Sequence, residues 1–539
     1  MKAPIPRRAG RAALLALTLM ASGPALAQET TQGLDVTPRN LAFAQALSSD
    51  TELSEYYRAR DYAPIWTAGD SASQARRAAL IMGMRMAPLH GLPESKYQPD
   101  ALIARMSNVR GAAELARLEI ELSKIYLDLA SDLHTGILTP SKVVPLILRK
   151  VPLQSAATYL DGLQNGDPAD YIRALPPQTA EYLGLLKAKF RLQDMMARGG
   201  YGAQVHIDVL KPGATGREVI ALRDRLTALG YMKPSVSASY DATMEAAVSA
   251  FQRDTGLAED GVAGPATMEQ INIPVSERLE SITVALERER WLNMPRGDRH
   301  VLVNLTDFSA RIVDFDHVTF ETRSVVGANR DGRRTPEFSD EMEHLIINPT
   351  WHVPRSIVVG EYLPQIQRNP NAASQLNIID RAGRVVPRDA VDWTQFNASN
   401  FPFAMKQPPS NSNALGLVKF MFPNKNNIYL HDTPSKSLFQ RNVRAFSHGC
   451  IRLQDPFDFA YALLAVQEDD PESFFQSRLR SGRETQVNLE THVPVHLIYR
   501  TAVVSPKGQI GFRQDIYGRD AKIWDALAAQ GVTLDPVRG

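Results

Sequence analysis

The stretch Arg444–Pro456 reads RAFSHGCIRLQDP and holds Cys450, the only cysteine among 539 residues. The residues HGCIRLQDP, which include the thiol, have a strand-like pattern. A cysteine attacks carbonyl carbon as its thiolate, yet a free thiol is only a few per cent ionised at neutral pH. A catalytic Cys450 therefore needs a base or a positive charge close by, and His448 lies two positions before it.

A second histidine ends the preceding strand-like run, Ile428–Pro434, which reads IYLHDTP. If the two strands bring their ends together, His431 comes within hydrogen-bond reach of the sulfur, and Asp432 follows it directly. Arg452 alternates onto the same strand face as Cys450, so its charge would favour the thiolate and hold a substrate carboxylate. Gly449 leaves the thiol accessible and lets backbone amides approach an oxyanion.

Two other interpretations of Cys450 stay open at this point. A buried cysteine can serve simply as a small apolar residue. A metal site could use Cys450, His448 and His431, but closed structural zinc sites usually have more thiolates at tight spacing. We therefore expect no metal.

The sequence around these motifs predicts a mainly β domain over residues 298–505. HVLVNLTDFSARIVDF, HVTFETRSVVGA, EHLIINPTWHVP and VPVHLIYRTAVVS are rich in β-forming residues, whereas DPFDFAYALLAV predicts a helix. The proline-rich residues 359–410 interrupt the β pattern and predict a lid-like insertion. Residues 506–539 form a C-terminal extension.

Two helical regions precede this domain. Residues 41–200 are mostly helical, and Leu118, Leu122, Ile125 and Leu129 form one apolar stripe. Residues 206–272 predict three short helices, with Asp241 as an N-cap and Gly230 and Gly256 as helix ends. LRDRLTALGY, YDATMEAAVSAFQ and GLAEDGVAGPAT resemble the small peptidoglycan-binding domain of cell-wall enzymes, although a generic three-helix spacer is the alternative.

The first 27 residues predict a secretory signal peptide. Four basic residues up to Arg11 precede an apolar run over residues 12–21, and Ala25-Leu26-Ala27 provides a cleavage site. The run is shorter than the roughly 20 residues that span a bilayer, so we expect cleavage rather than an uncleaved anchor, and no stable membrane span afterwards. A lone thiol in an exported protein indicates intermolecular pairing or a reactive group. The formal net charge of +1 argues against nucleic acid as the main partner.

IYLHDTP followed by RAFSHGCIRLQDP resembles the active site of L,D-transpeptidases of the YkuD type. Together with the helical scaffold and the wall-binding module, the chain resembles the large YcbB-like subfamily of Gram-negative bacteria. The expected fold is therefore multidomain α+β: a helical scaffold, a small three-helix module and a mainly β catalytic domain with a lid-like insertion.

The resemblance implies a role for each site residue. Cys450 is implied as the nucleophile and His431 as its base, oriented by a backbone carbonyl or by Asp432. His448, Gly449 and Cys450 would supply the oxyanion site, and Arg452 would support its geometry. The remaining implied residues are Ser447 in the turn, and Tyr429 and Trp351 against the substrate.

The resemblance also implies a reaction in the periplasm without cofactors. A tetrapeptide stem of peptidoglycan acylates the cysteine, and a second stem accepts the acyl group in a 3→3 crosslink. The implied partners are stem peptides and glycan, with other wall-synthesis proteins as further candidates. Two alternatives remain: an L,D-carboxypeptidase-type hydrolase using the same thiol, and a non-catalytic wall-binding protein.

Overall fold

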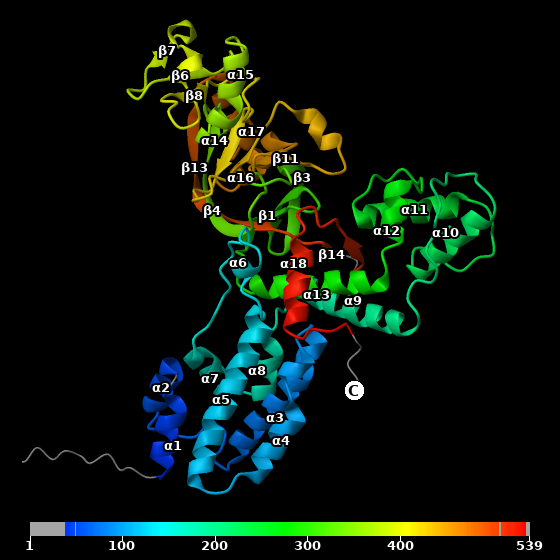
Figure 1. Ribbon diagram of the computed structural model, residues 1–539, viewed down its shortest axis with the longest axis vertical. Helices are drawn as coiled ribbons and strands as arrows, with labels where there is room; N and C mark the ends of the chain where they lie inside the picture. The colour runs from blue at the N-terminus through cyan, green and yellow to red at the C-terminus, as the bar shows by residue number, and fades with distance from the viewer. Residues whose placement is uncertain (1–37, 49, 506–507, 535–539) are drawn as a thin grey trace, which may run out of the picture.

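The computed structural model describes residues 38–48, 50–505 and 508–534 of the chain. The predicted signal peptide, residues 1–27, lies outside them. A helical region forms one end of the molecule, the mainly β domain forms the other, and a three-helix module projects from the side (Figure 1). Over the described residues, no helix is both long and apolar enough to cross a membrane.

The scaffold region is helical, as the sequence predicts. Its longest helix, α5, carries the predicted stripe, and Leu118, Leu122 and Leu129 are buried in the core of this region. Its helices are α1 (Pro38–Leu47), α2 (Thr51–Arg58), α3 (Ser71–Met86), α4 (Pro99–Asn108), α5 (Ala112–Thr135), α6 (Pro140–Val143), α7 (Ala156–Gln164), α8 (Pro168–Ala174) and α9 (Ala180–Ala197).

The side module consists of α10 (Arg217–Ala228), α11 (Ala242–Thr255) and α12 (Pro265–Ile271), packed around one small apolar core. Asp241 caps α11 by accepting a hydrogen bond from Met244 N at 2.9 Å. Gly256 ends the same helix with a φ of 71°, which favours glycine. The three predicted helices and their boundaries are confirmed.

The mainly β domain is built on a nine-stranded sheet of order β11-β3-β12-β10-β9-β4-β13-β1-β2, which closes on itself because β2 also pairs with β3. Helices α16 (Pro456–Leu464) and α17 (Pro471–Arg480) pack on it, with the rings of Phe420 and Phe459 4.8 Å apart. The strands are β1 (Arg299–Asn304), β2 (Ser309–Asp314), β3 (His317–Gly327), β4 (Phe338–Ile347), β9 (Val418–Met421), β10 (Leu430–His431), β11 (Ala445–Ser447), β12 (Ile451–Leu453) and β13 (Thr485–Ile498).

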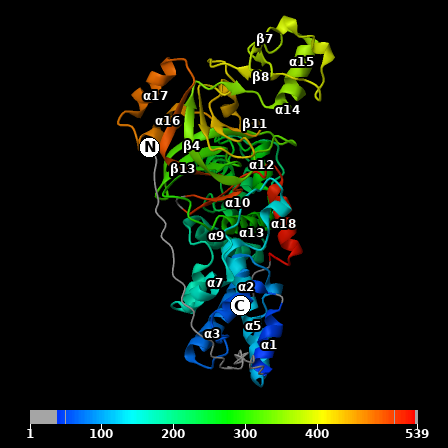
Figure 2. The same cartoon turned by 90° about the vertical axis from the view of Figure 1, so that its left-hand side faces the viewer.

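The insertion is a small unit with its own four-stranded sheet and apolar core, at the far end of the β domain (Figures 1 and 2). The prediction that EHLIINPTWHVP forms one strand is wrong. β4 ends at Ile347, where Asn348 adopts a φ of 51° before Pro349, and the chain re-forms a strand in the other sheet. The small sheet thus begins at Trp351, not near residue 359. Its elements are β5 (Trp351–His352), α14 (Arg355–Ile357), the π-helix η3 (Val358–Tyr362), α15 (Leu363–Arg368), β6 (Asn377–Ile379), β7 (Val385–Val386) and β8 (Ala404–Gln407).

The C-terminal extension returns to the centre of the molecule. The prediction that VPVHLIYRTAVVS forms one strand is wrong, because β13 ends at Ile498 and β14 (Ala502–Val504) pairs with β15 (Ile510–Phe512) in a separate two-stranded sheet. Helix α18 (Arg519–Ala529) lies against α13 (Val275–Trp291) (Figure 1).

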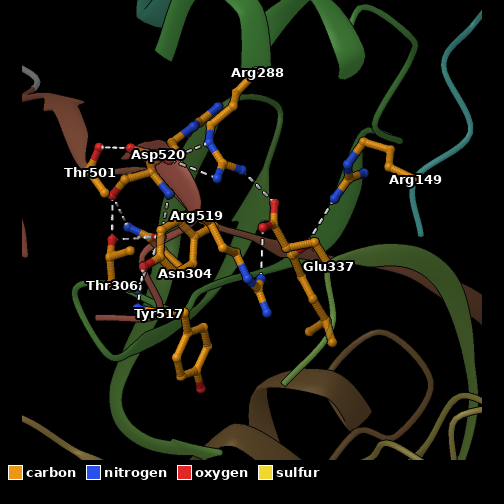
Figure 3. Close-up of polar contacts among 12 residues, drawn as sticks. Arg149, Arg288, Asn304, Thr306, Glu337, Thr501, Tyr517, Arg519 and Asp520 are labelled. Atoms are coloured by element: carbon orange, nitrogen blue, oxygen red, sulfur yellow. Dashed lines mark hydrogen bonds and ion pairs between the residues drawn. The ribbon is translucent and has the colours of Figure 1, made fainter. Parts of the chain in front are cut away.

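Helix α13 (Val275–Trp291) connects these regions, and it is buried along nearly its whole length. Its four consecutive charged residues Glu287–Arg290 are buried with their partners. Arg288 donates to Glu337 at 2.7 Å and to Asp520 at 2.8 Å (Figure 3), so it joins the β domain to the C-terminal helix. Glu289 accepts from Arg500 at 2.6 Å, and Arg290 donates to the His90 carbonyl of the scaffold at 2.9 Å.

Removing the Glu337 carboxylate should destabilise the protein strongly, because Arg519 and Arg288 both donate to it at 2.7 Å and all three side chains are buried. Leaving a buried charge without its partner costs about 3–5 kcal/mol. We expect Glu337→Gln to lower the unfolding free energy by that amount in denaturant titrations. The matched control is Asp194→Ala, which removes an ion pair with Arg198 in which both side chains are exposed. This variant should change the unfolding free energy by less than about 1 kcal/mol. Equal effects of both variants would contradict a stabilising role for the buried network.

Candidate active site

His431 and Cys450 lie on neighbouring strands. β10 pairs with β12 in parallel, with Leu430 opposite Ile451 and His431 opposite Arg452, and Ile451 N donates to Tyr429 O at 3.1 Å. The nucleophile turn therefore enters the sheet directly beside the strand that carries the histidine. This arrangement brings together the two motifs that the sequence singles out.

The His431 side chain is oriented by a backbone carbonyl. It is 4% exposed, and its Nδ1 lies 2.5 Å from the carbonyl oxygen of Asp432. A carbonyl only accepts, so Nδ1 carries the proton in the neutral ring and Nε2 keeps its lone pair. Burial, and then the Arg452 charge, lower the pKa of His431 to about 3, so the ring is neutral at physiological pH.

The Cys450 thiol is also neutral in this structure. Burial raises the pKa of Cys450 to about 11, although the residue keeps intermediate exposure and Tyr429, Arg452 and Lys419 all oppose the rise. Among the described residues its hydrogen-bond partners are the Asn427 carbonyl, at 3.4 Å, and Tyr429. The Arg452 charge favours the thiolate, as expected from the sequence, but the desolvation of sulfur outweighs it.

The turn before the nucleophile is held by Ser447. Its Oγ donates to the Cys450 carbonyl at 2.6 Å and accepts from Gly449 N at 3.1 Å, while Gly449 adopts a φ of 120° that favours glycine. The Gly449 amide, expected at the oxyanion site, is thus engaged within the turn. In the described part of the chain, the amides of His448 and Cys450 have no such acceptor and remain as candidate oxyanion donors.

His448 points to the insertion. Its Nε2 lies 2.6 Å from the Glu361 carboxylate on η3, and the same carboxylate also binds Arg333 from the loop between β3 and β4. Glu361 therefore connects the insertion to the nucleophile turn.

The Asp432 carboxylate stabilises the local loops. It accepts from Lys436 Nζ at 2.8 Å and from Leu417 N at 2.9 Å, and its backbone carbonyl, not its carboxylate, orients His431. The sequence leaves open whether a backbone carbonyl or the Asp432 carboxylate orients His431, and in the structure the backbone carbonyl of Asp432 does so.

The two aromatic residues expected against the substrate lie in different places. Tyr429 is half-buried, bonds to Cys450 and lies with its ring 5.7 Å from that of His431. Trp351 is 8% exposed and packs in the core of the insertion, edge-on to Tyr362.

Several residues near the thiol are not found from the sequence. Lys419 on β9 pairs with His431, and its only sequence signal is its place between the apolar residues Val418 and Phe420. Glu361 and Asn427 reach the site through contacts distant in sequence, so no local pattern indicates them.

Thr335 joins the nucleophile turn to the buried ion pairs. Its Oγ donates to the Gly449 carbonyl at 2.7 Å and accepts from Gly327 N at 2.9 Å, and its own carbonyl accepts from Arg519 at 2.6 Å. Arg519 in turn binds Glu337 (Figure 3). The backbone beside Cys450 is therefore tied to the centre of the molecule.

Comparisons with known proteins match three parts of the chain to described families. Residues 298–476 match the family described as L,D-transpeptidase catalytic domain, residues 51–188 the family described as Scaffold domain, and residues 215–271 the family described as "Putative peptidoglycan binding domain".

Two relatives match parts of the chain. A Haemophilus influenzae protein named "Putative L,D-transpeptidase" is 32% identical over 265 residues, which are 47% of this chain and 53% of that protein. The N-acetylmuramoyl-L-alanine amidase CwlL of Bacillus licheniformis is 46% identical over 61 residues, 11% of this chain and 17% of the amidase. The chain thus spans about half the length of the first relative and less of the second.

A solved structure of the L,D-transpeptidase from Xylanimonas cellulosilytica covers 54% of this chain and 98% of its own, at 17% identity and a TM-score of 0.16. A TM-score at this level does not define a shared fold.

A cysteine at the entry of a closed sheet, beside a strand that ends in a buried histidine, defines a candidate acyl-transfer site. With the family matches, the class is clear: the protein carries an L,D-transpeptidase catalytic domain of the YkuD family over residues 298–476, together with a scaffold domain and a peptidoglycan-binding domain.

Alkylation of Cys450 by iodoacetamide should be slow at neutral pH and should accelerate about tenfold per pH unit between pH 7 and 9, because only the thiolate reacts and the pKa of the thiol is raised to about 11. Mass spectrometry gives the rate directly, since no other cysteine is present, and Cys450→Ser is the control for other sites. A rate that stays flat above pH 7 would instead indicate a thiolate–imidazolium pair formed in advance.

Thr335→Val should slow acylation of Cys450 by a carbapenem about 10- to 100-fold, because loss of the hydroxyl leaves the Gly449 carbonyl and Gly327 amide unpaired and lets the turn shift. Thr335→Ser, which keeps the hydroxyl, should retain most of the rate. Iodoacetamide alkylation of each variant serves as the reference, because it needs the thiolate but not the oxyanion geometry. Parallel losses in both reactions would mean that Thr335 affects only the fold or the thiol pKa.

Proposed function

We propose that the protein is a periplasmic L,D-transpeptidase that forms 3→3 crosslinks in peptidoglycan through a Cys450 thioester. The observation that carries the proposal is the parallel pairing of β10 with β12, which supports a position of the His431 ring on the strand beside Cys450. The catalytic and peptidoglycan-binding family matches support the same substrate.

The first half of the reaction transfers the acyl group to sulfur. Cys450 Sγ attacks the carbonyl carbon of the third residue, a diamino acid, in a tetrapeptide stem while His431 Nε2 takes the thiol proton. The oxyanion is held by backbone amides of the nucleophile turn. The C–N bond breaks, His431 returns the proton to the leaving nitrogen, and D-alanine departs from the thioester.

The second half restores the thiol. The side-chain amine of another stem attacks the thioester carbonyl, its proton passes to His431, and the C–S bond breaks to give the new amide. The proton then returns to sulfur. The peptide-bond energy is conserved in the thioester, so the cycle requires neither nucleotide nor metal.

The neutral states of both groups fit general-base catalysis. With the pKa of the thiol raised and that of His431 lowered, proton transfer accompanies the attack on the carbonyl and does not precede it. Arg452 and Lys419 then stabilise the negative charge that develops on sulfur.

The insertion is proposed as the lid that excludes water from the thioester. Its Glu361 contact with His448 supports this role, because it brings the insertion against the nucleophile turn. Without such exclusion, water would replace the amine and the protein would act as an L,D-carboxypeptidase-type hydrolase.

A non-catalytic wall-binding protein is the second candidate. The match of residues 215–271 to the family described as "Putative peptidoglycan binding domain" favours it, because such a module needs no reactive thiol. In that case the peptidoglycan-binding module would carry the function alone, with the glycan or other wall-synthesis proteins as partners.

Incubation with purified disaccharide-tetrapeptide, followed by mass spectrometry of protein and products, tests these functions. A transpeptidase should give a covalent adduct heavier by the disaccharide-tripeptide, and a crosslinked product. Cys450→Ala should give neither. A disaccharide-tripeptide product without crosslinks would identify the hydrolase. Absence of both adduct and product in the unmodified protein would contradict catalysis.

A further inference from the structure

Three basic side chains form a row across the strands beside the thiol. In the register of β9, β10 and β12, Lys419 pairs with His431, and His431 pairs with Arg452. Side chains of directly paired residues lie on the same face of a sheet. Cys450, two positions before Arg452, enters on that face as well.

The Lys419 side chain lies on the side of the thiol. Its ammonium group is 5.8 Å from the centre of the Tyr429 ring, and Tyr429 bonds to Cys450. Lys419 is half-buried, and burial lowers its pKa, so its charge is partly desolvated and is available to a ligand at the thiol.

Neither cation has a counter-ion of its own. In the part of the chain that the structure describes, no ion pair joins Lys419 or Arg452 to a carboxylate, and the buried Nε of Arg452 has no hydrogen-bond partner. Glu484 favours the Lys419 charge from farther away, but its own carboxylate accepts from Thr350 N.

Other buried arginines of this protein bind either a carboxylate or a backbone carbonyl: Arg149 donates to the Leu497 carbonyl at 2.8 Å, and Arg278 donates to the Gln270 carbonyl at 2.9 Å. Arg288 and Arg500 bind carboxylates at 2.7 and 2.6 Å. Buried cations are normally paired in this way, so two unpaired cations beside a nucleophile indicate a binding site for an anion.

We propose that Lys419 and Arg452 together bind the terminal carboxylate of the amino acid that leaves the donor stem. The proposal rests on the proposed function, because it specifies the donor of the same site. Lys419 then becomes a specificity-determining residue that the sequence motifs do not include.

The geometry of the donor favours this carboxylate over others in the stem. The terminal carboxylate lies one residue beyond the scissile carbonyl, about 3.8 Å along the chain. Neighbouring strands are about 4.8 Å apart, so a carbonyl carbon at Cys450 Sγ brings the carboxylate over the row of cations. A stem with one further residue would place an amide there and its carboxylate too far away. The site would therefore select tetrapeptide stems.

Two donors that differ only in this group test the proposal: the tetrapeptide stem with a terminal carboxylate and the same stem with a terminal carboxamide. We expect the unmodified protein to prefer the carboxylate in kcat/KM by roughly 10- to 100-fold, the range for a charge-assisted contact. Lys419→Met should reduce this ratio about tenfold, and Lys419→Arg should largely restore it. Lys522→Met, an equal charge change on the exposed face of α18, should leave the ratio unchanged.

The ratio of kcat/KM for the two donors shows whether Lys419 binds the donor carboxylate or only changes the ionisation of the Cys450 thiol. If Lys419 only affected ionisation of Cys450, Lys419→Met would slow both donors equally and leave the ratio unchanged, which would overturn the proposal.

Equilibrium binding separates this proposal from the proposed function. Titration of both donors into Cys450→Ala, with and without Lys419→Met, measures the preference without chemistry. A carboxylate preference that depends on Lys419, together with no turnover by the unmodified protein, would retain the anion site and overturn only the transpeptidase function. Equal binding of the two donors to Cys450→Ala would overturn the anion site whatever the activity.

Discussion

The buried charges of α13 are the constraint on which the arrangement of the domains depends. A helix surrounded by other elements cannot leave Arg288, Glu289 or Arg290 in water. Arg288 and Glu289 find their charged partners in other parts of the chain, whereas Arg290 pairs with Glu287 on the same helix and also donates to the His90 carbonyl of the scaffold. Those partners come from the scaffold, the β domain and the C-terminal extension. Because the penalty for an unpaired buried charge is large, the same interactions that stabilise the molecule also define how its parts fit together.

This constraint extends to the nucleophile. Glu337 binds Arg519, Arg519 binds the Thr335 carbonyl, and the Thr335 hydroxyl holds the Gly449 carbonyl. The turn that presents the thiol is consequently supported from behind by the centre of the molecule, while Glu361 contacts it from the insertion. An oxyanion site made of backbone amides needs such support, since its donors cannot be repositioned by a change of rotamer.

The sequence predicts most of the strands and the three-helix module, because these follow from local periodicity and capping, and it singles out His431 and Cys450 through the motifs that contain them. Prediction from the sequence fails where contacts with distant parts of the chain determine the local conformation or environment of a residue. Asn348 breaks the predicted strand before Trp351 by a left-handed backbone conformation, so that tryptophan becomes a core residue of the insertion. The ionisation of Cys450 depends on its burial, which no motif reveals, and the burial outweighs the charges that the sequence does show. Lys419 and Thr335 enter the site through strand register and tertiary hydrogen bonds.

Glu361 is the sole carboxylate paired with both His448 and Arg333 in the described residues, and it belongs to the insertion. A displacement of η3 would therefore do more than uncover a surface. It would withdraw one negative charge from the nucleophile turn and release His448 and Arg333 together. The position of η3 would in this way change the electrostatic potential at the turn that carries Cys450.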